Sequence, residues 1–232
     1  EALNVENDLG IPPQDDLAWR AARLVLDEKR SRCGMQITVH KRIPTGAGLG
    51  GGSSDAAAVL WAVDRLTPPA LPCERLLSLG AQLGSDVPLF LSGGLMRATG
   101  RGEKIAPIFP SRREHFVLII PPMHCDTARV YRERQGRIAP DLGGPSKPQL
   151  GKNDLYEAAI FLYPELKSYA QAIKELGAEY VGMSGSGSTF FAAFNDAKLA
   201  ARAHATMQAA FTRAQVYVVR GTSTGFLAKG EE

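Results

Sequence analysis

A glycine-rich segment between a strand-like and a helix-like stretch constrains this chain more than any other feature. The segment 44–54, called the first glycine loop below, reads PTGAGLGGGSS and places five glycines within seven residues. It follows an alternating stretch, 35–41, that predicts a strand, and it leads into an alanine-rich stretch, 54–66, that predicts a helix. Glycine has no Cβ atom to keep an anion away from the main chain, and it tolerates positive φ angles. The pattern therefore predicts a loop that binds phosphate at the start of a helix.

The polar residues at the end of this loop are expected to cap the helix. A side chain of Ser53, Ser54 or Asp55 can accept a hydrogen bond from an amide of the first turn. The other amides of that turn, together with the positive end of the helix dipole, attract phosphate.

Other glycine motifs fit the loop less well. Gly46, Gly48 and Gly51 satisfy the loose dinucleotide-binding fingerprint, but the acidic residue at the required distance, Asp64, falls inside the predicted helix. The lysine of a Walker loop is absent, and so are the His-Arg-Asp and Asp-Phe-Gly motifs of protein kinases. The plain alternative is a glycine-rich connection that binds nothing.

Composition excludes several classes of function. The chain has 232 residues, of which 44% are hydrophobic and 22% charged, as in ordinary globular proteins. A net charge of +3 is too small to indicate a nucleic-acid partner, and no apolar run is long enough to predict a membrane span. Three cysteines without metal-type spacing indicate reduced thiols, so we expect a cytoplasmic protein, or one of the plastid stroma if the source is a plant or alga.

The order of predicted elements favours an α+β fold in two lobes, since strands and helices mix without a regular βα repeat. The expected domains are 1–110 and 111–232, with the boundary at 109–113, and a long loop is expected over 136–152. Helices are expected from Asp15 or Asp16 to about Asp27 and over 54–66, 72–83, 127–135, 153–162, 164–175 and 196–211. Strands are expected over 35–41, 95–99, 104–108, 116–120, 179–183, 188–194 and 215–220.

A second glycine–serine segment, 182–189, stands between two predicted strands and is called the second glycine loop. Its small and hydroxylated residues can bring main-chain amides close to a ligand, although by itself the pattern favours a simple hairpin turn. Two such loops in one small chain suggest that both meet at one ligand. The residues expected to shape the site are Gly182, Ser184, Gly185, Ser186, Gly187 and Ser188.

Asp86 follows Gly84 and Ser85 at the start of an apolar segment, Val87–Leu91. If it faces the phosphate loop, its carboxylate can accept a hydroxyl proton and orient the attacking oxygen. Spacing alone favours the commoner interpretation, in which an aspartate beside glycine and serine forms a turn or caps a helix.

Three strings in fixed order resemble the GHMP family of small-molecule kinases. They are PTGAGLGGGSSDAA at 44–57, GSDVPLFLSGG at 84–94 and GMSGSGSTFFA at 182–192. The shorter strings DLAWRAA at 16–22, DTARVY at 126–131 and NDL at 153–155 extend the likeness over almost the whole chain. The resemblance favours the catalytic interpretation of Asp86.

The resemblance implies a ribosomal-S5-like N-terminal lobe, a ferredoxin-like C-terminal lobe and substrates held between them. It implies ATP and Mg²⁺ as cofactors, with Asp86 activating the acceptor hydroxyl and Ser53 or Ser54 helping to place the metal ion. Lys41, Asp16 and Leu17 match positions near the adenine. The residues implied to wrap the ATP phosphates are Pro44, Thr45, Gly46, Ala47, Gly48, Leu49, Gly50, Gly51, Gly52, Ser53 and Ser54.

Within the family, the triple glycine followed by Ser-Ser-Asp-Ala-Ala is similar to kinases of the non-mevalonate route to isoprenoids (terpenoids). This implies phosphorylation of the C2 hydroxyl of the methylerythritol unit in a small cytidine diphosphate substrate, by a monomer or homodimer. One alternative is a family member acting on homoserine or mevalonate, although such kinases usually have a shorter Gly-Leu-Gly-Ser-Ser loop. The other is a truncated nucleotide-binding relic without catalysis. The family's first strand, Pro-Ala-Lys-Leu-Asn-Leu with a catalytic lysine, and its Gly-Tyr-His turn have no counterpart here, so an N-terminal segment is expected to be missing.

Overall fold

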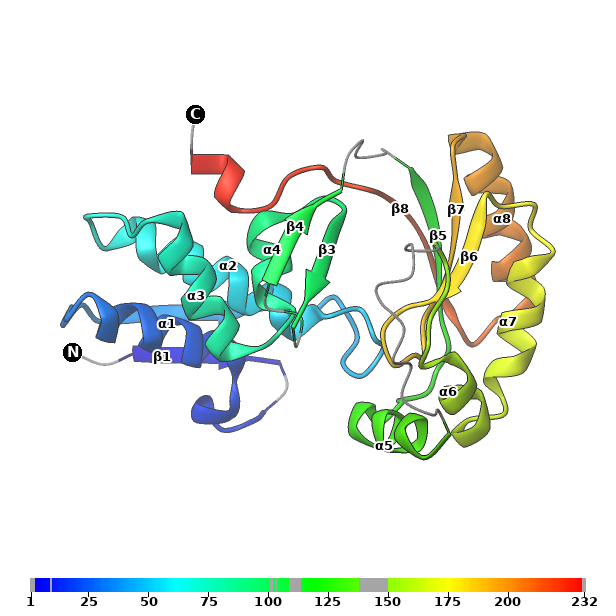
Figure 1. Cartoon of the computed structure of the whole chain (residues 1–232), viewed down its shortest axis with the longest axis horizontal. Coiled ribbons are helices and arrows are strands. Elements are labelled where there is room, and N and C mark those ends of the chain that lie inside the picture. Colours follow the sequence, from blue (N-terminus) through cyan, green and yellow to red (C-terminus); the bar gives the residue numbers. More distant parts are fainter. Residues whose placement is uncertain are drawn as a thin grey trace. The chain divides into compact units, whose positions relative to one another are not determined.

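The computed structural model describes residues 3–8, 10–100, 102, 104–108, 114–137 and 150–230. By its internal contacts the chain divides into two compact units (Figure 1). The first unit comprises Glu1–Ile43, Gly50–Arg112 and Thr222–Glu232, and the second comprises Pro44–Leu49 and Arg113–Gly221. The two expected domains are continuous stretches of sequence, whereas these units are not, because 44–49 belongs with the second unit and 222–232 with the first.

Two parallel strands form one layer of the first unit. β1 (Leu3–Asn7) pairs with β2 (Met35–Val39), so that Val5 lies opposite Ile37. In both strands half-buried and exposed residues alternate, as expected for strands with one face against a core. β2 was expected over 35–41 and is confirmed, whereas β1 was not predicted, because only two of its five residues are apolar.

Helices supply most of the core of the first unit. They are α1 (Leu17–Glu28), α2 (Gly51–Leu66), α3 (Cys73–Leu83) and α4 (Val87–Ser92). The unit also contains the short 3-10 helices η1 (Pro13–Asp15) and η2 (Leu227–Gly230) and the hairpin β3 (Met96–Thr99)–β4 (Lys104–Pro107). Alanines of α1 and α2, among them Ala21, Ala22, Ala56 and Ala57, are completely buried where the two helices pack. Such small side chains allow close helix contact, which explains the alanine-rich sequence.

The second unit contains one four-stranded antiparallel sheet. β5 (His115–Ile120) is followed by α5 (Thr127–Arg137), α6 (Tyr156–Leu162) and α7 (Leu166–Lys174), then by β6 (Tyr180–Met183), β7 (Phe190–Phe194), α8 (Ala197–Ala210) and β8 (Gln215–Arg220). The strands lie in the order β6-β7-β5-β8, and all neighbours are antiparallel. This is the order of a split βαβ fold, so the expected ferredoxin-like lobe is confirmed.

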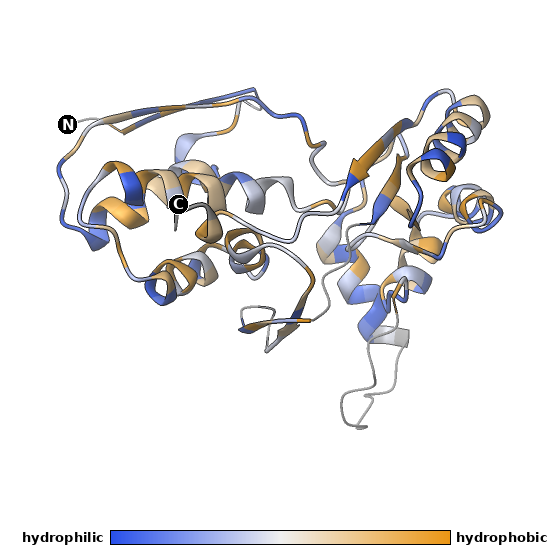
Figure 2. Ribbon diagram, turned by 90° about the horizontal axis from the view of Figure 1, so that it is seen from above, coloured by the Kyte–Doolittle hydropathy of each residue, from blue (hydrophilic) through white to orange (hydrophobic). Residues whose placement is uncertain are grey.

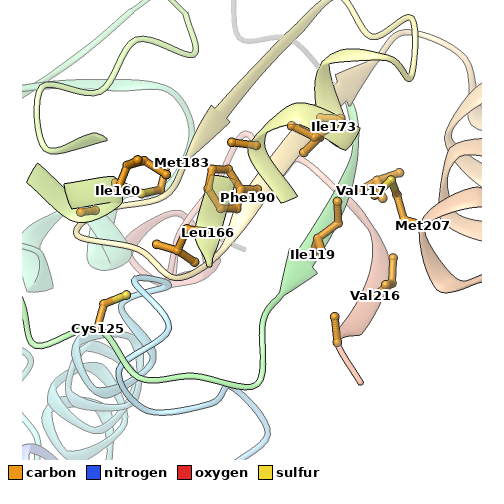
Figure 3. Packing of buried hydrophobic residues seen from close by; sticks show 14 of the residues in the cluster. Val117, Ile119, Cys125, Ile160, Leu166, Ile173, Met183, Phe190, Met207 and Val216 are labelled. Atoms are coloured by element: carbon orange, nitrogen blue, oxygen red, sulfur yellow. The ribbon is translucent and has the colours of Figure 1, made fainter. Parts of the chain in front are cut away.

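One face of this sheet is covered by α7 and α8 (Figure 1). Hydrophobic residues run along the strands, and both helices alternate hydrophobic with hydrophilic residues (Figure 2). Ile119 and Phe190 from the sheet, Ile173 from α7 and Met207 from α8 lie in one packed cluster and are at most 1% exposed (Figure 3).

Most expected elements are present within a few residues, with two corrections near the site. α2 begins at Gly51 instead of residue 54, and the apolar segment after Asp86, to which no structure was assigned, is the helix α4. The expected boundary at 109–113 and most of the expected loop 136–152 lie outside the described residues.

Candidate functional site

The first glycine loop enters α2 without a capping side chain. Gly50 is the N-cap residue and has a φ of 65°, in the left-handed region that favours glycine. Ser53, Ser54 and Asp55 were expected to cap the helix, and this was wrong, because the helix starts at Gly51 and places them in its first turns. Since a glycine occupies the cap, no side chain competes for the amides of the first turn.

The amides of this loop form a long run without partners. Within the described part of the chain, the N–H groups of residues 45–53 donate no hydrogen bond, and the next amide, of Ser54, bonds to the Gly50 carbonyl at 2.9 Å. Unpaired amides are the donors that bind anions at helix N-termini. The unpaired amides of residues 45–49 thus lie in the second unit, and those of residues 50–53 lie in the first unit at the positive end of α2.

Close packing in the first unit also requires glycine at the start of α2. A Cβ atom on Gly50 would lie 2.9 Å from the ring of Phe90, and one on Gly51 would lie 2.9 Å from Cγ2 of Ile43. The glycines therefore serve packing as well as access to the main chain, and only the second role follows from the local sequence.

In the second unit, residues 46–48 are held by their carbonyl oxygens. The Gly46 carbonyl accepts a hydrogen bond from the Cys125 amide at 3.4 Å, and that of Ala47 accepts one from the Thr189 amide at 3.2 Å. The Gly48 carbonyl accepts one from the Ser184 hydroxyl at 2.9 Å. These bonds fix the carbonyl side of the segment and leave its amides unpaired.

The second glycine loop is the connection of the β6–β7 hairpin, as the plain interpretation of its sequence predicted. It also contacts residues 47 and 48 of the first loop directly, within the second unit. Two of its hydroxyls are engaged elsewhere in that unit, because Ser186 pairs with Thr127 at 2.8 Å and Ser188 donates to the Met123 carbonyl at 2.9 Å. The predicted meeting of the two loops is thus observed as a contact of loop with loop.

Two residues that support this hairpin were not assigned a role from sequence. Asn153 donates from its side-chain nitrogen to the carbonyls of Met183 and Gly185, each at 2.8 Å. Thr127 holds Ser186, as described above. Both belong to short strings that marked the family resemblance, but no local pattern shows which distant loop they contact.

Asp86 stands at the N-terminus of α4, and its side chain is exposed. It makes no capping hydrogen bond, and no partner for its carboxylate is found among the described residues. Of the alternative interpretation, the helix cap is therefore not observed, but the turn is, since the Val87 amide donates to the Gly84 carbonyl at 3.2 Å across Ser85 and Asp86. The helix α4 packs on α2, and its Phe90 lies next to Gly50 at the start of α2. Asp86 directly precedes α4 in the same unit.

The residues expected near an adenine have structural partners in the first unit. Asp16 caps α1 by accepting from the Ala18 amide at 2.7 Å, and its second oxygen accepts from the Asn7 side chain at 2.6 Å. Leu17 packs where a Cβ atom of Gly52 would point, and the Lys41 ammonium pairs with the Asp55 carboxylate. Asp16 is therefore a helix cap that is 9% exposed, while Leu17 and Lys41 adjoin the first turns of α2.

One thiol lies against these loops. Cys125 is fully buried, and burial raises the pKa of its thiol to about 11. It stays protonated at neutral pH and packs near Gly187, whose Cβ atom would lie 3.4 Å from its sulfur. Its role here is packing.

Residues 16–94 match the family model described as GHMP kinases N terminal domain, and residues 147–213 match GHMP kinases C terminal. The 4-diphosphocytidyl-2-C-methyl-D-erythritol kinase of Thiobacillus denitrificans is 38% identical over 223 residues, which cover 95% of this chain and 75% of the relative. That of Chromobacterium violaceum is 39% identical over 191 residues, covering 80% of this chain and 66% of the relative. The chain thus spans about two thirds of the length of several curated relatives that it matches.

Solved structures show the same likeness. A crystal structure of 4-(cytidine 5'-diphospho)-2C-methyl-D-erythritol kinase has a TM-score of 0.77 and 34% identity, and the match covers 96% of this chain and 84% of that one. A homoserine kinase from Cytophaga hutchinsonii has a TM-score of 0.75 at 16% identity, which shows a common fold only.

Proposed function

Because the chain belongs to the GHMP kinase family, we propose that it transfers a phosphoryl group from ATP to the C2 hydroxyl of 4-diphosphocytidyl-2-C-methyl-D-erythritol. The observation that carries the proposal is the set of unpaired amides at the start of α2, residues 50–53, where no side chain caps the helix, together with those of residues 45–49 in the second unit. Such amides suit the triphosphate of a nucleotide. The choice of acceptor is supported by the relatives at 38–39% identity that carry this kinase's name.

Each group of the chain then has a distinct task. The amides of the first glycine loop bind phosphate oxygens, and the second glycine loop keeps them in place through the carbonyls of residues 47 and 48. Asp86, exposed and without a described partner, accepts the proton of the acceptor hydroxyl. Alignment and charge neutralisation supply most of the acceleration in phosphoryl transfer, so little covalent chemistry is asked of the protein.

The residues near the start of α2 fit a magnesium ion. Mg²⁺ prefers oxygen ligands and takes one or two from the protein, with the rest from phosphate and water. Ser53 and Ser54 offer hydroxyl oxygens in the first turn, whereas the neighbouring Asp55 is paired with Lys41. Bound with ATP, the ion would neutralise charge on the phosphate oxygens.

An assay of ADP release with three acceptors tests the proposal. We expect turnover with the cytidine diphosphate substrate and at most weak turnover with homoserine or mevalonate. Preference for homoserine or mevalonate would overturn the acceptor. ATP-induced thermal stabilisation without ADP release under any acceptor would overturn the catalytic assignment and favour a nucleotide-binding protein.

A further inference from the structure

A cavity of about 250 Å³ opens in the second unit where β6 runs into the second glycine loop. Its apolar lining includes the half-buried Tyr156 and Val181, and it borders core residues that are at most 4% exposed, Ile173, Met183 and Phe190. These three side chains belong to the packed cluster of Figure 3.

The charged residues that line this cavity are both cationic. Among the residues that the structure describes, Lys152 and Lys174 contribute to its wall, and no aspartate or glutamate does. Within the described residues, neither ammonium group has a carboxylate partner within 4.0 Å. A ligand that complements this surface has an apolar body and a negatively charged end.

The wall of the cavity is also the support of the second glycine loop. Asn153 lines the cavity. Its side-chain nitrogen donates to the Met183 and Gly185 carbonyls, and its side-chain oxygen accepts from the Leu155 amide at 2.8 Å. Gly182 lies so close to Gly151 that a Cβ atom on it would be 2.7 Å from the Gly151 carbonyl oxygen. A ligand in the cavity would contact the residues that set the position of Ser184.

We propose that this cavity is a binding site for a small amphipathic anion, with an apolar body and a single phosphate or carboxylate group. The half-buried Tyr156 and Val181 contact the apolar body, and the two lysines bind the charged group. The alternative is that the lysine stems only cover apolar surface while their ammonium groups remain in water. If the cavity is an anion site, a negative charge on the ligand increases its affinity; if the lysine stems only cover apolar surface, the charge has no effect on affinity.

Phenyl phosphate is a suitable probe, with benzyl alcohol as its uncharged counterpart. A Kd on the order of 1 mM is expected for a ligand of this size. The double variant Lys152→Ser/Lys174→Ser should bind phenyl phosphate roughly tenfold or more weakly, because both charge-assisted contacts are lost. Lys167→Ser, on the same helix as Lys174 but outside the cavity, is the matched control and should bind like the unchanged protein.

Backbone amide shifts in NMR spectra locate the probe. Binding should move the signals of Gly151 and Gly182 and leave that of Gly177, in the same unit, in place. Equal affinity of phenyl phosphate for the double variant and the unchanged protein, or shifts confined to the first glycine loop, would overturn the proposal. Thermal melting shows whether each variant is folded. Since no turnover is measured, failure of the kinase assignment leaves this test unaffected.

Discussion

The hydroxyl of Ser184 donates a hydrogen bond of 2.9 Å to the carbonyl oxygen of Gly48, which lies 136 positions earlier in the chain. The two backbones are in close contact here, because a Cβ atom on Gly48 would lie 2.3 Å from the Ser184 carbonyl oxygen. Two loops that are far apart in sequence thus form one assembly in the second unit. Phosphate binding by the first loop is expected to depend on the second.

Replacing Ser184 by alanine should weaken ATP binding. The variant loses one hydrogen bond to the first loop, worth about 0.5–1.5 kcal/mol, which corresponds to roughly a two- to tenfold rise in the Kd for ATP. Isothermal titration measures this. Ser168→Ala removes a hydroxyl that donates at 2.9 Å to the carbonyl of Glu165, just before α7, and it should leave ATP affinity unchanged. An equal effect of both substitutions would count against the loop contact.

Replacing Gly48 by alanine should destabilise the protein. Gly48 has a φ of 75°, which costs a residue with a side chain about 1–2 kcal/mol, and the new methyl group would meet backbone oxygens. We expect a loss of about 3 kcal/mol or more in urea unfolding. Gly177→Ala is the control, because its φ is 67° but nothing lies within 4 Å of the added atom. Equal losses would show that the contact with Ser184 adds nothing.

In a full-length version that carries the family's lysine strand, replacing Asp86 by asparagine should abolish most of the turnover. An amide cannot take the acceptor's proton, and loss of a general base lowers kcat by about 10²–10⁴-fold. Nucleotide affinity should stay nearly the same, as the carboxylate has no described partner in the fold. Asp196→Asn is the control, because asparagine caps α8 about as well as aspartate does. Unchanged turnover in Asp86→Asn would rule out the assigned role.

Stability should decrease in alkaline solution because of Cys125. Its pKa is about 11 in the folded protein against an ordinary 9.0, so the unfolded chain loses the proton first. The stabilising contribution is complete below pH 9 and is lost as the pH rises to 11, by up to about 1.4 kcal/mol per pH unit.

Urea unfolding across this range tests the effect. Cys125→Ala should flatten the pH dependence, whereas replacement of the exposed Cys33 should not change it. Under native conditions, an alkylating reagent should modify Cys33 and Cys73 well before Cys125. Rapid modification of Cys125 in the folded state would contradict its burial.

Several features follow from the sequence because they depend on neighbouring residues. Asp16 precedes an amphipathic stretch, and it does cap α1. The runs 116–120 and 215–220 form β5 and β8, since apolar and β-branched segments of that length favour strands, although only β5 is largely buried. The phosphate-loop prediction rests on the same kind of local signal.

The start of α2 shows where local reasoning fails. Ser53, Ser54 and Asp55 were expected as caps of this helix, yet Gly50 is its N-cap residue. Phe90, on α4, lies where a side chain on Gly50 would be placed, and such a contact between segments cannot be read from either of them.

The sequence by itself determined where the chain carries glycine, hydroxyl and carboxylate groups, and which strings of them match a kinase family. Only the tertiary structure decided that Ser184 bonds to Gly48 and that Asn153 holds the hairpin carrying Ser184. The reason is physical: capping and periodicity depend on residues within a few positions. Contacts between distant loops depend on how a whole sheet brings its connections together.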